Sequence, residues 1–253
     1  MLFVEESINL KNIAKRKGVH LLLYILLSIS GYSQSSIDSS SYAYWAAREI
    51  FFRRLGPELN LYNGVFYKEF IQNETDEGHP YFESDLLVDG SINYEGIHYE
   101  DVSILYDLVN DKVIIDHKFG GFKFQLISEK VNSFSLHNHF FVHLISSKPN
   151  TPPPNGFYER LYDGRFKAYA KWSKKKFDAI GAGAVQVRYE DQNQFYIFNG
   201  IEYIQVKSKS SVLNVLKDKK QSISKFIRKY KLKFGANCVE SLPRILAFYE
   251  SGP

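Results

Sequence analysis

Apolar and polar residues alternate in many short segments between Tyr62 and Val206. Residues 122–126 show the pattern clearly, because apolar side chains fall at every second position, as in a strand with one buried face. Glycine, asparagine and proline separate the segments and are typical of turns. The pattern predicts a mainly β domain over residues 61–206, an antiparallel meander that forms a barrel or a sandwich, with an N-terminal helix and C-terminal helices packed on it.

The turn residues also predict which strands pair. We expect hairpins across Asp89-Gly90, where the glycine can supply a positive φ, and across residues 109–111. Further along the chain, we expect a hairpin across Asp163-Gly164 and pairing of residues 185–189 with residues 195–198. These hairpins would make sequential strands neighbours in the meander.

A helical period replaces the alternation near the C-terminus. Ile223, Phe226 and Ile227 stand at the spacing of one helix face. Pro243 is tolerated in the first turn of a final helix. Because an apolar helix face needs a partner, we predict that residues 207–253 form a basic helical tail packed on the β domain.

The N-terminus has the order of segments that is typical of a secretory signal peptide. Basic residues between Lys11 and Lys17 precede an apolar run from Val19 to Ile29, and small residues follow it. The run is shorter than the ~20 residues that a membrane-spanning helix needs, which makes a permanent anchor the less favoured alternative. We predict a signal peptide over residues 1–33 and export of the chain.

A serine-rich segment follows the predicted signal peptide. We expect residues 34–60 to form a spacer and a short helix that ends at Gly56-Pro57. The processed chain would contain no transmembrane segment. It would reside in the periplasm, at the outer membrane or outside the cell.

The composition agrees with a β-rich chain that has a sizeable core. Of its 253 residues, 44% are hydrophobic, and 18 Tyr and 20 Phe favour strands. The formal net charge of +4 is small for this length, which argues against nucleic acid as the main partner. Cys238 is the only cysteine, so no internal disulfide forms, and we expect its side chain to be buried rather than catalytic.

Several short strings, taken in order, resemble a protein family. They are Leu61-Tyr62-Asn63-Gly64, residues 78–82, residues 90–96, residues 105–108, residues 156–164 and the lysine-rich tail from Asp218 to Tyr249. Together they resemble uncharacterised exported proteins common in the Bacteroidota, over nearly all of the processed chain. The resemblance implies an envelope location and assigns no activity to individual residues.

Three histidines form the most suggestive chemical pattern. In one extended strand, His137, His139 and His143 would share a face, because alternate residues point the same way. Imidazoles at this spacing can chelate Zn²⁺ or Cu²⁺. No Cys, Asp or Glu in the same segment completes a ligand shell, and the polar outer face of a strand is the favoured explanation. We therefore predict no metal and no cofactor, and keep the three histidines only as candidates.

Acidic residues cluster in two predicted loops, at residues 74–77 before His79 and at residues 95–101. Paired carboxylates can hydrolyse a glycosidic bond when held ~5 Å or ~6.5–9.5 Å apart, but loop carboxylates are normally solvated. The sequence also lacks a Gly-x-Ser-x-Gly nucleophile motif. No catalytic residue is predicted, and a hydrolase acting on an envelope or imported polymer, either a glycan or a peptide, is the alternative to a binding protein.

Basic residues gather in the predicted helical tail, where Asp218 is the only acidic residue between Lys207 and Lys233. Such a surface can contact anionic lipid head groups, an acidic glycan or an acidic envelope protein, although a solvated helix face is the simpler explanation. The candidate partner-binding residues are Lys219, Lys220, Lys225, Arg228 and Lys229. A second basic group, Lys171 and residues 174–176, is expected in a turn.

The aromatic residues offer another kind of surface. An open sheet face lined with tyrosine would suit a glycan or a peptide, whereas the β propensity of these residues favours a buried aromatic core. Because no catalytic group emerges, the sequence predicts an exported envelope protein, most simply a non-catalytic binding or assembly module.

Overall fold

The structure is a computed structural model, which describes residues 60–68, 77–117, 121–146, 153–181 and 184–252. The chain divides into two compact units, Met1–Gly56 and Pro57–Pro253, and all described residues belong to the second. The predicted signal peptide over residues 1–33 and the predicted N-terminal helix lie outside the described residues.

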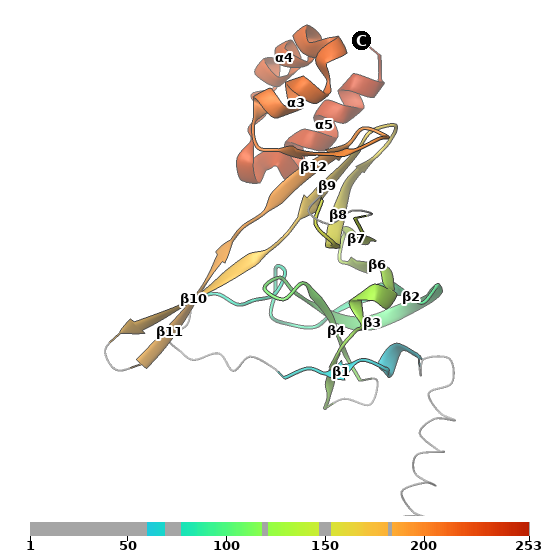
Figure 1. The fold of residues 1–253 in the computed structure, drawn as a ribbon, viewed down its shortest axis with the longest axis vertical. Coiled ribbons are helices and arrows are strands. Elements are labelled where there is room, and N and C mark those ends of the chain that lie inside the picture. Colours follow the sequence, from blue (N-terminus) through green and yellow to red (C-terminus); the bar gives the residue numbers. More distant parts are fainter. Residues whose placement is uncertain (1–59, 69–76, 118–120, 147–152, 182–183, 253) are drawn as a thin grey trace, which may run out of the picture. The chain divides into compact units, whose positions relative to one another are not determined.

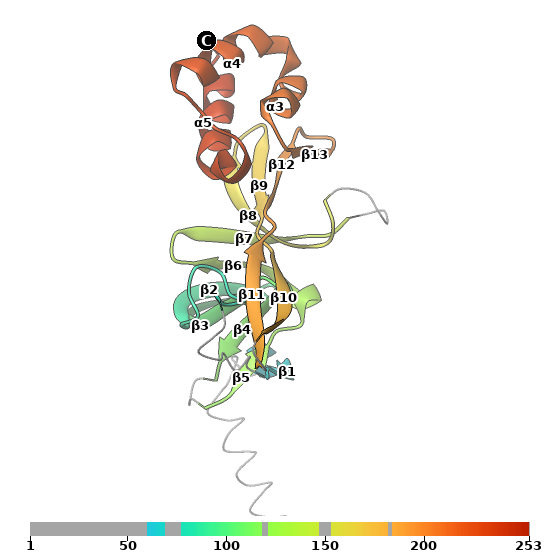
Figure 2. The same ribbon diagram turned by 90° about the vertical axis from the view of Figure 1, so that its left-hand side faces the viewer.

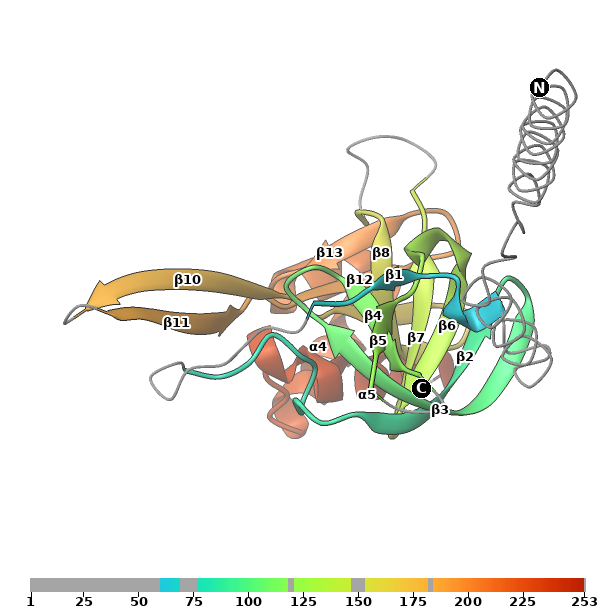
Figure 3. The same cartoon turned by 90° about the horizontal axis from the view of Figure 1, so that it is seen from below.

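Strands dominate the described residues (Figure 1). They are β1 (Val65–Phe66), β2 (Val88–Tyr94), β3 (Ile97–Asp107), β4 (Lys112–Asp116), β5 (Lys123–Gln125), β6 (Val131–Leu136), β7 (His139–Leu144), β8 (Gly156–Asp163), β9 (Lys167–Lys171), β10 (Lys174–Gly181), β11 (Ala184–Asp191), β12 (Gln194–Phe198) and β13 (Tyr203–Val206). Eleven of them form one sheet in the order β1-β5-β4-β3-β2-β6-β7-β8-β9-β12-β13, and every pairing is antiparallel. β10 and β11 form a separate two-stranded sheet (Figure 3).

The predicted mainly β, antiparallel fold is therefore confirmed, but the predicted barrel is wrong. β1 and β13 are the two edges of an open sheet and do not pair with each other. The eleven strands form one continuous hydrogen-bonded sheet. The sheet joins two meanders, β2 to β5 and β6 to β9, through pairing of β2 with β6.

The predicted hairpin across Asp89-Gly90 is wrong, because both residues lie inside β2. The chain turns instead at Glu95 and Gly96, which both have positive φ. Gly90 is needed for a different reason, since an added Cβ would clash with the carbonyl oxygen of Ser135 in the neighbouring β6. A glycine that predicted a turn thus allows two strands to approach closely.

The predicted pairing of residues 185–189 with residues 195–198 is also wrong. β11 pairs with β10 along its whole length, from Lys174 opposite Asp191 to Gly181 opposite Ala184. β12 pairs with β9 and β13 instead. Residues 174–176 therefore begin a strand and not the predicted turn, because a two-stranded ribbon can expose polar side chains on both faces. The hairpins predicted across residues 109–111 and across Asp163-Gly164 are confirmed.

The C-terminal segment is helical, with α3 (Lys209–Val215), α4 (Lys220–Lys229) and α5 (Cys238–Glu250). Short 3₁₀ turns are η2 (Ser128–Lys130), η3 (Lys217–Lys219) and η4 (Gly235–Asn237). Ser208 and Ser211 form a capping box that starts α3. α5 begins at Cys238, so Pro243 lies inside the helix rather than in its first turn. Burial of Leu242 and Ile245 beside the proline offsets the hydrogen bond that the proline cannot donate.

Two large apolar clusters form the core. The first lies among β2 to β8 and is rich in aromatic rings, for example Phe134 stacked on Phe141 with centroids 4.7 Å apart. The second lies between the β9–β12–β13 end of the sheet and the helices, where Ala168 and Ile197 pack with Leu246. Figure 2 shows α3, α4 and α5 grouped beside these strands. Cys238 is buried in the second cluster, as predicted, and burial raises the pKa of its thiol.

Candidate functional site

The three candidate histidines do not form one row on a strand. His137 lies in the turn before β7, with a φ of 49°, whereas His139 and His143 belong to β7. The His143 ring packs on the ring of Phe157, with centroids 4.8 Å apart, and burial lowers the pKa of His143. Within the described ranges, no group of three or more His, Cys, Asp or Glu residues is arranged to hold a metal ion. His137 therefore does not share a strand with His139 and His143, because β7 begins only at His139.

His139 lies instead between two glutamates. Its Nδ1 is 2.7 Å from Oε1 of Glu159 in β8, and its Nε2 is 3.2 Å from Oε1 of Glu83. The second oxygen of Glu83 lies 3.5 Å from Nδ1 of His137. Both ring nitrogens of His139 thus face carboxylate oxygens, one from each glutamate.

Glu159 is the buried member of this group, with 6% of its surface exposed. Trp172 Nε1 donates a hydrogen bond of 2.7 Å to its second oxygen. The ring of Phe82 contacts both His139 and Trp172, at centroid distances of 5.0 Å and 5.6 Å. A buried carboxylate needs such partners. We refer to Glu83, His137, His139, Glu159 and Trp172 as the His139 cluster.

The two glutamates of the His139 cluster were not among the acidic residues that the sequence singled out. The available signal was the position of Glu159 directly after Phe157 and Tyr158 in β8, in a stretch in which residues 156–159 are all buried. A charged residue at a core position of a strand calls for a partner. Glu83 carried no comparable signal, because it lies in an irregular segment with a φ of 53°.

The predicted acidic loops do not converge on a site. Residues 74–76 lie outside the described residues. Glu77 joins β11 through its backbone, as its N–H donates to Val187 and its carbonyl oxygen accepts from Tyr189. Glu95 pairs with Lys130 at 2.6 Å. The loop predicted over residues 95–101 is wrong beyond Gly96, because Glu100 and Asp101 are exposed residues of β3. Each described residue of these loops thus has a local, structural setting.

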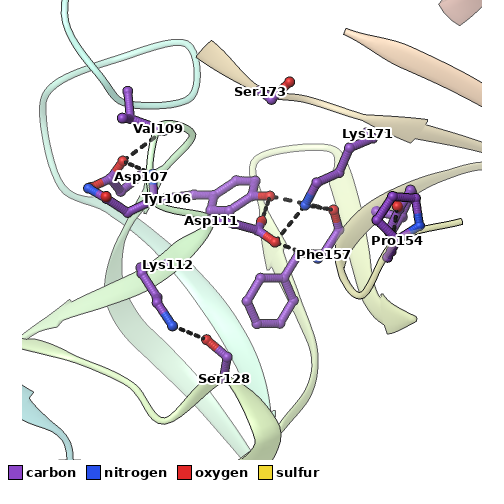
Figure 4. Close-up of polar contacts among 12 residues, drawn as sticks. Tyr106, Asp107, Val109, Asp111, Lys112, Ser128, Pro154, Phe157, Lys171 and Ser173 are labelled. Carbon is purple, nitrogen blue, oxygen red and sulfur yellow. Dashed lines mark hydrogen bonds and ion pairs between the residues drawn. The ribbon is translucent and has the colours of Figure 1, made fainter. Parts of the chain in front are cut away.

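A second polar cluster connects strands that are not neighbours in the sheet (Figure 4). Asp111 accepts a hydrogen bond of 2.6 Å from the Tyr106 hydroxyl, and its other oxygen lies 2.6 Å from Lys171 Nζ. Lys171 also donates to the carbonyl oxygen of Phe157 at 3.1 Å. Gly156 adjoins the pair at a φ of 147°, where an added Cβ would clash with the Asp111 carboxylate.

Burial dominates the electrostatics of this second cluster. It raises the pKa of Tyr106 well above its usual value, and the Asp111 carboxylate raises it further. Burial lowers the pKa of Lys171, against the opposing effect of Asp111. These contacts connect the turn after β3 to the start of β8 and the end of β9. We therefore interpret Tyr106, Asp111 and Lys171 as residues that stabilise the fold.

The C-terminal segment carries a charge opposite to that of the remaining chain. Residues 207–253 contain 11 Lys or Arg and three Asp or Glu, which gives a formal charge of +8. Since the whole chain carries +4, its other residues together carry −4. The exposed cations around α4 are Lys220, Lys225, Arg228, Lys229, Lys231 and Arg244, which we call the basic surface.

Four of the five candidate partner-binding residues belong to this basic surface. The fifth, Lys219, is half-buried and donates a hydrogen bond of 3.1 Å to the carbonyl oxygen of Tyr249, near the end of α5. That contact satisfies a terminal helix carbonyl and gives Lys219 a structural role. Arg244 joins the surface from a distant point of the sequence, because its guanidinium and Lys229 both lie over the ring of Tyr230.

The cations of the basic surface form no ion pair with another described residue. In the part of the chain that the structure describes, none of them lies within ion-pair distance of Asp or Glu. On α4, Lys225 has Arg228 and Lys229 three and four residues further on, which places three like charges on one helix face. This face lies opposite the buried Ile223 and Ile227.

The tyrosines of the sheet are mainly core residues. Tyr158, Tyr169 and Tyr196 form a buried cluster on β8, β9 and β12, with Phe198 and Tyr203 packed against it. Burial raises the pKa of each of the three hydroxyls. These side chains therefore do not form an open, tyrosine-lined binding face.

Within the described residues, no helix has the combination of length and hydrophobicity that spanning a bilayer requires. Comparison with models of protein families, with curated proteins and with solved structures finds no match for the chain.

Proposed function

We propose that this chain is an exported, non-catalytic binding or assembly module of the cell envelope, which contacts an anionic partner through its basic surface. The observation that carries the proposal is the set of cations around α4 that have no carboxylate within ion-pair distance among the described residues. Like charges three and four residues apart destabilise a helix, whereas Lys–Glu pairs at the same spacing would stabilise it. A negatively charged partner would offset the repulsion between the like charges on α4.

The helix dipole accounts for only some of these charges. Arg228 and Lys229 lie in the last turn of α4, where cations are favourable. Lys220 lies at the opposite end, where the dipole disfavours a cation, and the first turn of α4 has no acidic residue. Positive charge at both ends of one helix is better explained by an external anion than by helix stability.

Export is supported by the order of basic, apolar and small residues over residues 1–33. The test is expression of the full chain in a Gram-negative host, followed by cell fractionation and N-terminal sequencing. We expect the envelope fraction to contain a chain that begins at Gln34. An intact chain confined to the cytosol would contradict this part of the proposal.

Binding is tested with the processed protein and three soluble polymers: dextran sulfate, poly-glutamate and uncharged dextran. We expect the two anionic polymers to bind, with affinity that falls as salt concentration rises, because the contacts are made by exposed charges. The proposal fails if the protein binds neither anionic probe at low salt, or if it binds uncharged dextran as tightly.

The second candidate function is hydrolysis of an envelope or imported polymer, and the observation in its favour is the His139 cluster. Glu159 and Trp172 fix one side of His139, while Glu83 on the other side is half-exposed and accessible to a ligand. Glycan or peptide hydrolysis by the wild-type protein that disappears in Glu83→Gln would favour this alternative. A variant that keeps its fold and its polymer binding would show that the two functions are separate.

A further inference from the structure

We infer that the anionic partner of the basic surface is the head-group layer of a phospholipid bilayer. The inference rests on the proposed function, because it names the partner of the same surface. Three features of the described residues favour lipid over a protein or a glycan: the kind of cation, one exposed aromatic ring, and the backbone conformation of Lys231.

Lysine predominates over arginine in this part of the chain. Of the 11 cations in residues 207–253, nine are lysines, and four of the six cations of the basic surface are lysines. The arginine fork suits a built site that grips one carboxylate or phosphate in a fixed geometry. Lysine is a compact, hydrated point charge on a flexible stem, which suits attraction to a layer of mobile anionic head groups.

Two of the cations lie over an exposed aromatic ring. Tyr230 follows α4 and is 45% exposed. Lys229 Nζ and Arg244 Cζ lie 5.3 Å and 5.4 Å from its ring centroid, and the ring of Phe226 lies 4.7 Å away. A tyrosine with one apolar side and a polar hydroxyl is favoured at the boundary between head groups and acyl chains. An exposed aromatic ring in contact with a lysine and an arginine therefore fits a membrane interface.

Lys231 occupies a backbone position at which glycine is usual. Its φ is 51°, in the left-handed region. Its N–H donates to the Arg228 carbonyl oxygen, and the N–H of Leu232 donates to that of Ile227. These are the two hydrogen bonds of a Schellman motif, in which glycine normally takes the left-handed position. The chain has a cation there despite the conformational cost. This favours a role for the Lys231 side chain in binding a partner rather than in stabilising the fold.

The inference is tested by sedimentation of the processed protein with vesicles. Phosphatidylcholine vesicles are compared with vesicles in which one third of the lipid is phosphatidylglycerol. We expect binding to the anionic vesicles alone, at an ionic strength of about 0.15 M. Each cation near an anionic bilayer contributes roughly a fivefold gain in affinity. The triple variant Lys225→Gln, Arg228→Gln, Lys229→Gln should therefore bind at least tenfold more weakly.

A matched variant shows whether vesicle binding depends on the position of the cations or only on the net charge of the protein. Lys175→Gln, Lys176→Gln and Arg188→Gln remove three exposed cations from β10 and β11. We expect this hairpin variant to bind anionic vesicles nearly as well as the wild type. An equal loss in the two triple variants would overturn the assignment, because net charge and not the basic surface would then set the affinity.

Lys231→Gly is expected to change vesicle binding and thermal stability in opposite directions. Glycine relieves the left-handed conformation, so the variant should unfold at a higher temperature than the wild type while binding anionic vesicles more weakly. Unchanged vesicle binding by Lys231→Gly would remove the support that its conformation gives to the inference. Binding to dextran sulfate or poly-glutamate without binding to either vesicle would overturn the lipid inference and leave the proposed function standing. Binding to none of these probes would overturn both.

Discussion

Lys171 Nζ lies 2.6 Å from Oδ2 of Asp111, although four strands separate β9 from β3 in the sheet order. Asp111 belongs to the turn after β3 and also accepts a hydrogen bond from Tyr106. The ion pair can form only because the sheet curves and brings this turn to the start of β8. Gly156 leaves the space that the two side chains occupy there. The pair therefore closes the curved part of the sheet over its aromatic core.

We expect Asp111→Asn to lower the free energy of unfolding by about 2 kcal/mol, because it leaves the largely buried Lys171 ammonium without its carboxylate. The control is Asp163→Asn, which removes an exposed carboxylate paired with Arg160 and Lys167 and should cost about 0.5 kcal/mol. Urea denaturation followed by tryptophan fluorescence measures both. Similar losses in the two variants would show that the Asp111 contacts do not hold the sheet together.

Gly90 is expected to be among the most sensitive glycines of the sheet. In Gly90→Ala the new Cβ would clash with the Ser135 carbonyl oxygen, so the pairing of β2 with β6 must open. We expect a loss of about 3 kcal/mol or more in the free energy of unfolding. Gly96→Ala is the control, because its φ is positive but its Cβ would meet open space, and it should cost about 1 kcal/mol. If Gly96→Ala proves the more damaging, the close approach at Gly90 is not what holds the two meanders together.

The same glycine shows where the sequence was informative about the fold and where it was not. Alternation within one segment is a local property, so most strands and the hairpin across residues 109–111 were predictable. Which strand lies beside β2 depends on a contact with Ser135, far along the chain, and no local signal encodes it. A glycine permits a turn and a close approach of two strands equally well. The sequence around Asp89-Gly90 therefore predicts a hairpin that the structure does not have.

The candidate sites differ in predictability for the same reason. The basic surface was visible in the sequence, because Lys225, Arg228 and Lys229 are neighbours on one helix. The His139 cluster was not, since Glu83 and Glu159 come from segments that only the folded sheet brings to β7. Spacing alone suggested a row of histidines, whereas the fold gives His139 carboxylates as partners.

The His139 cluster yields a prediction about stability. Glu159→Gln retains the shape of the side chain but removes the charge that His139 contacts in a buried position. We expect a loss of about 2 kcal/mol in the free energy of unfolding. Glu83→Gln removes the half-exposed partner and should cost less than about 0.5 kcal/mol. Chemical denaturation near pH 6 measures both variants. A larger loss for Glu83→Gln would contradict the prediction, because Glu83 and not Glu159 would then contribute more to stability.

The buried tyrosines predict a loss of stability in alkali. Burial, with a smaller effect from Tyr203, raises the pKa of Tyr169 to about 12, whereas an unfolded tyrosine titrates near pH 10. Below pH 10 the hydroxyl keeps its proton in both states and stability is unaffected. Between pH 10 and pH 12 the unfolded chain releases a proton that the folded chain retains, so the free energy of unfolding falls as pH rises.

Tyr169→Phe removes this titrating group and isolates its share of the alkaline loss. The variant should match the wild type near pH 7 and lose about 1.4 kcal/mol less than the wild type at pH 11. Phe198→Leu is the matched control, because it lowers packing in the same cluster without adding or removing a titrating group. Its loss in the free energy of unfolding should be the same at every pH. Urea denaturation at a series of pH values measures all three proteins. A wild type and Tyr169→Phe with parallel pH profiles would mean that the hydroxyl of Tyr169 ionises as readily in the folded protein as in the unfolded chain.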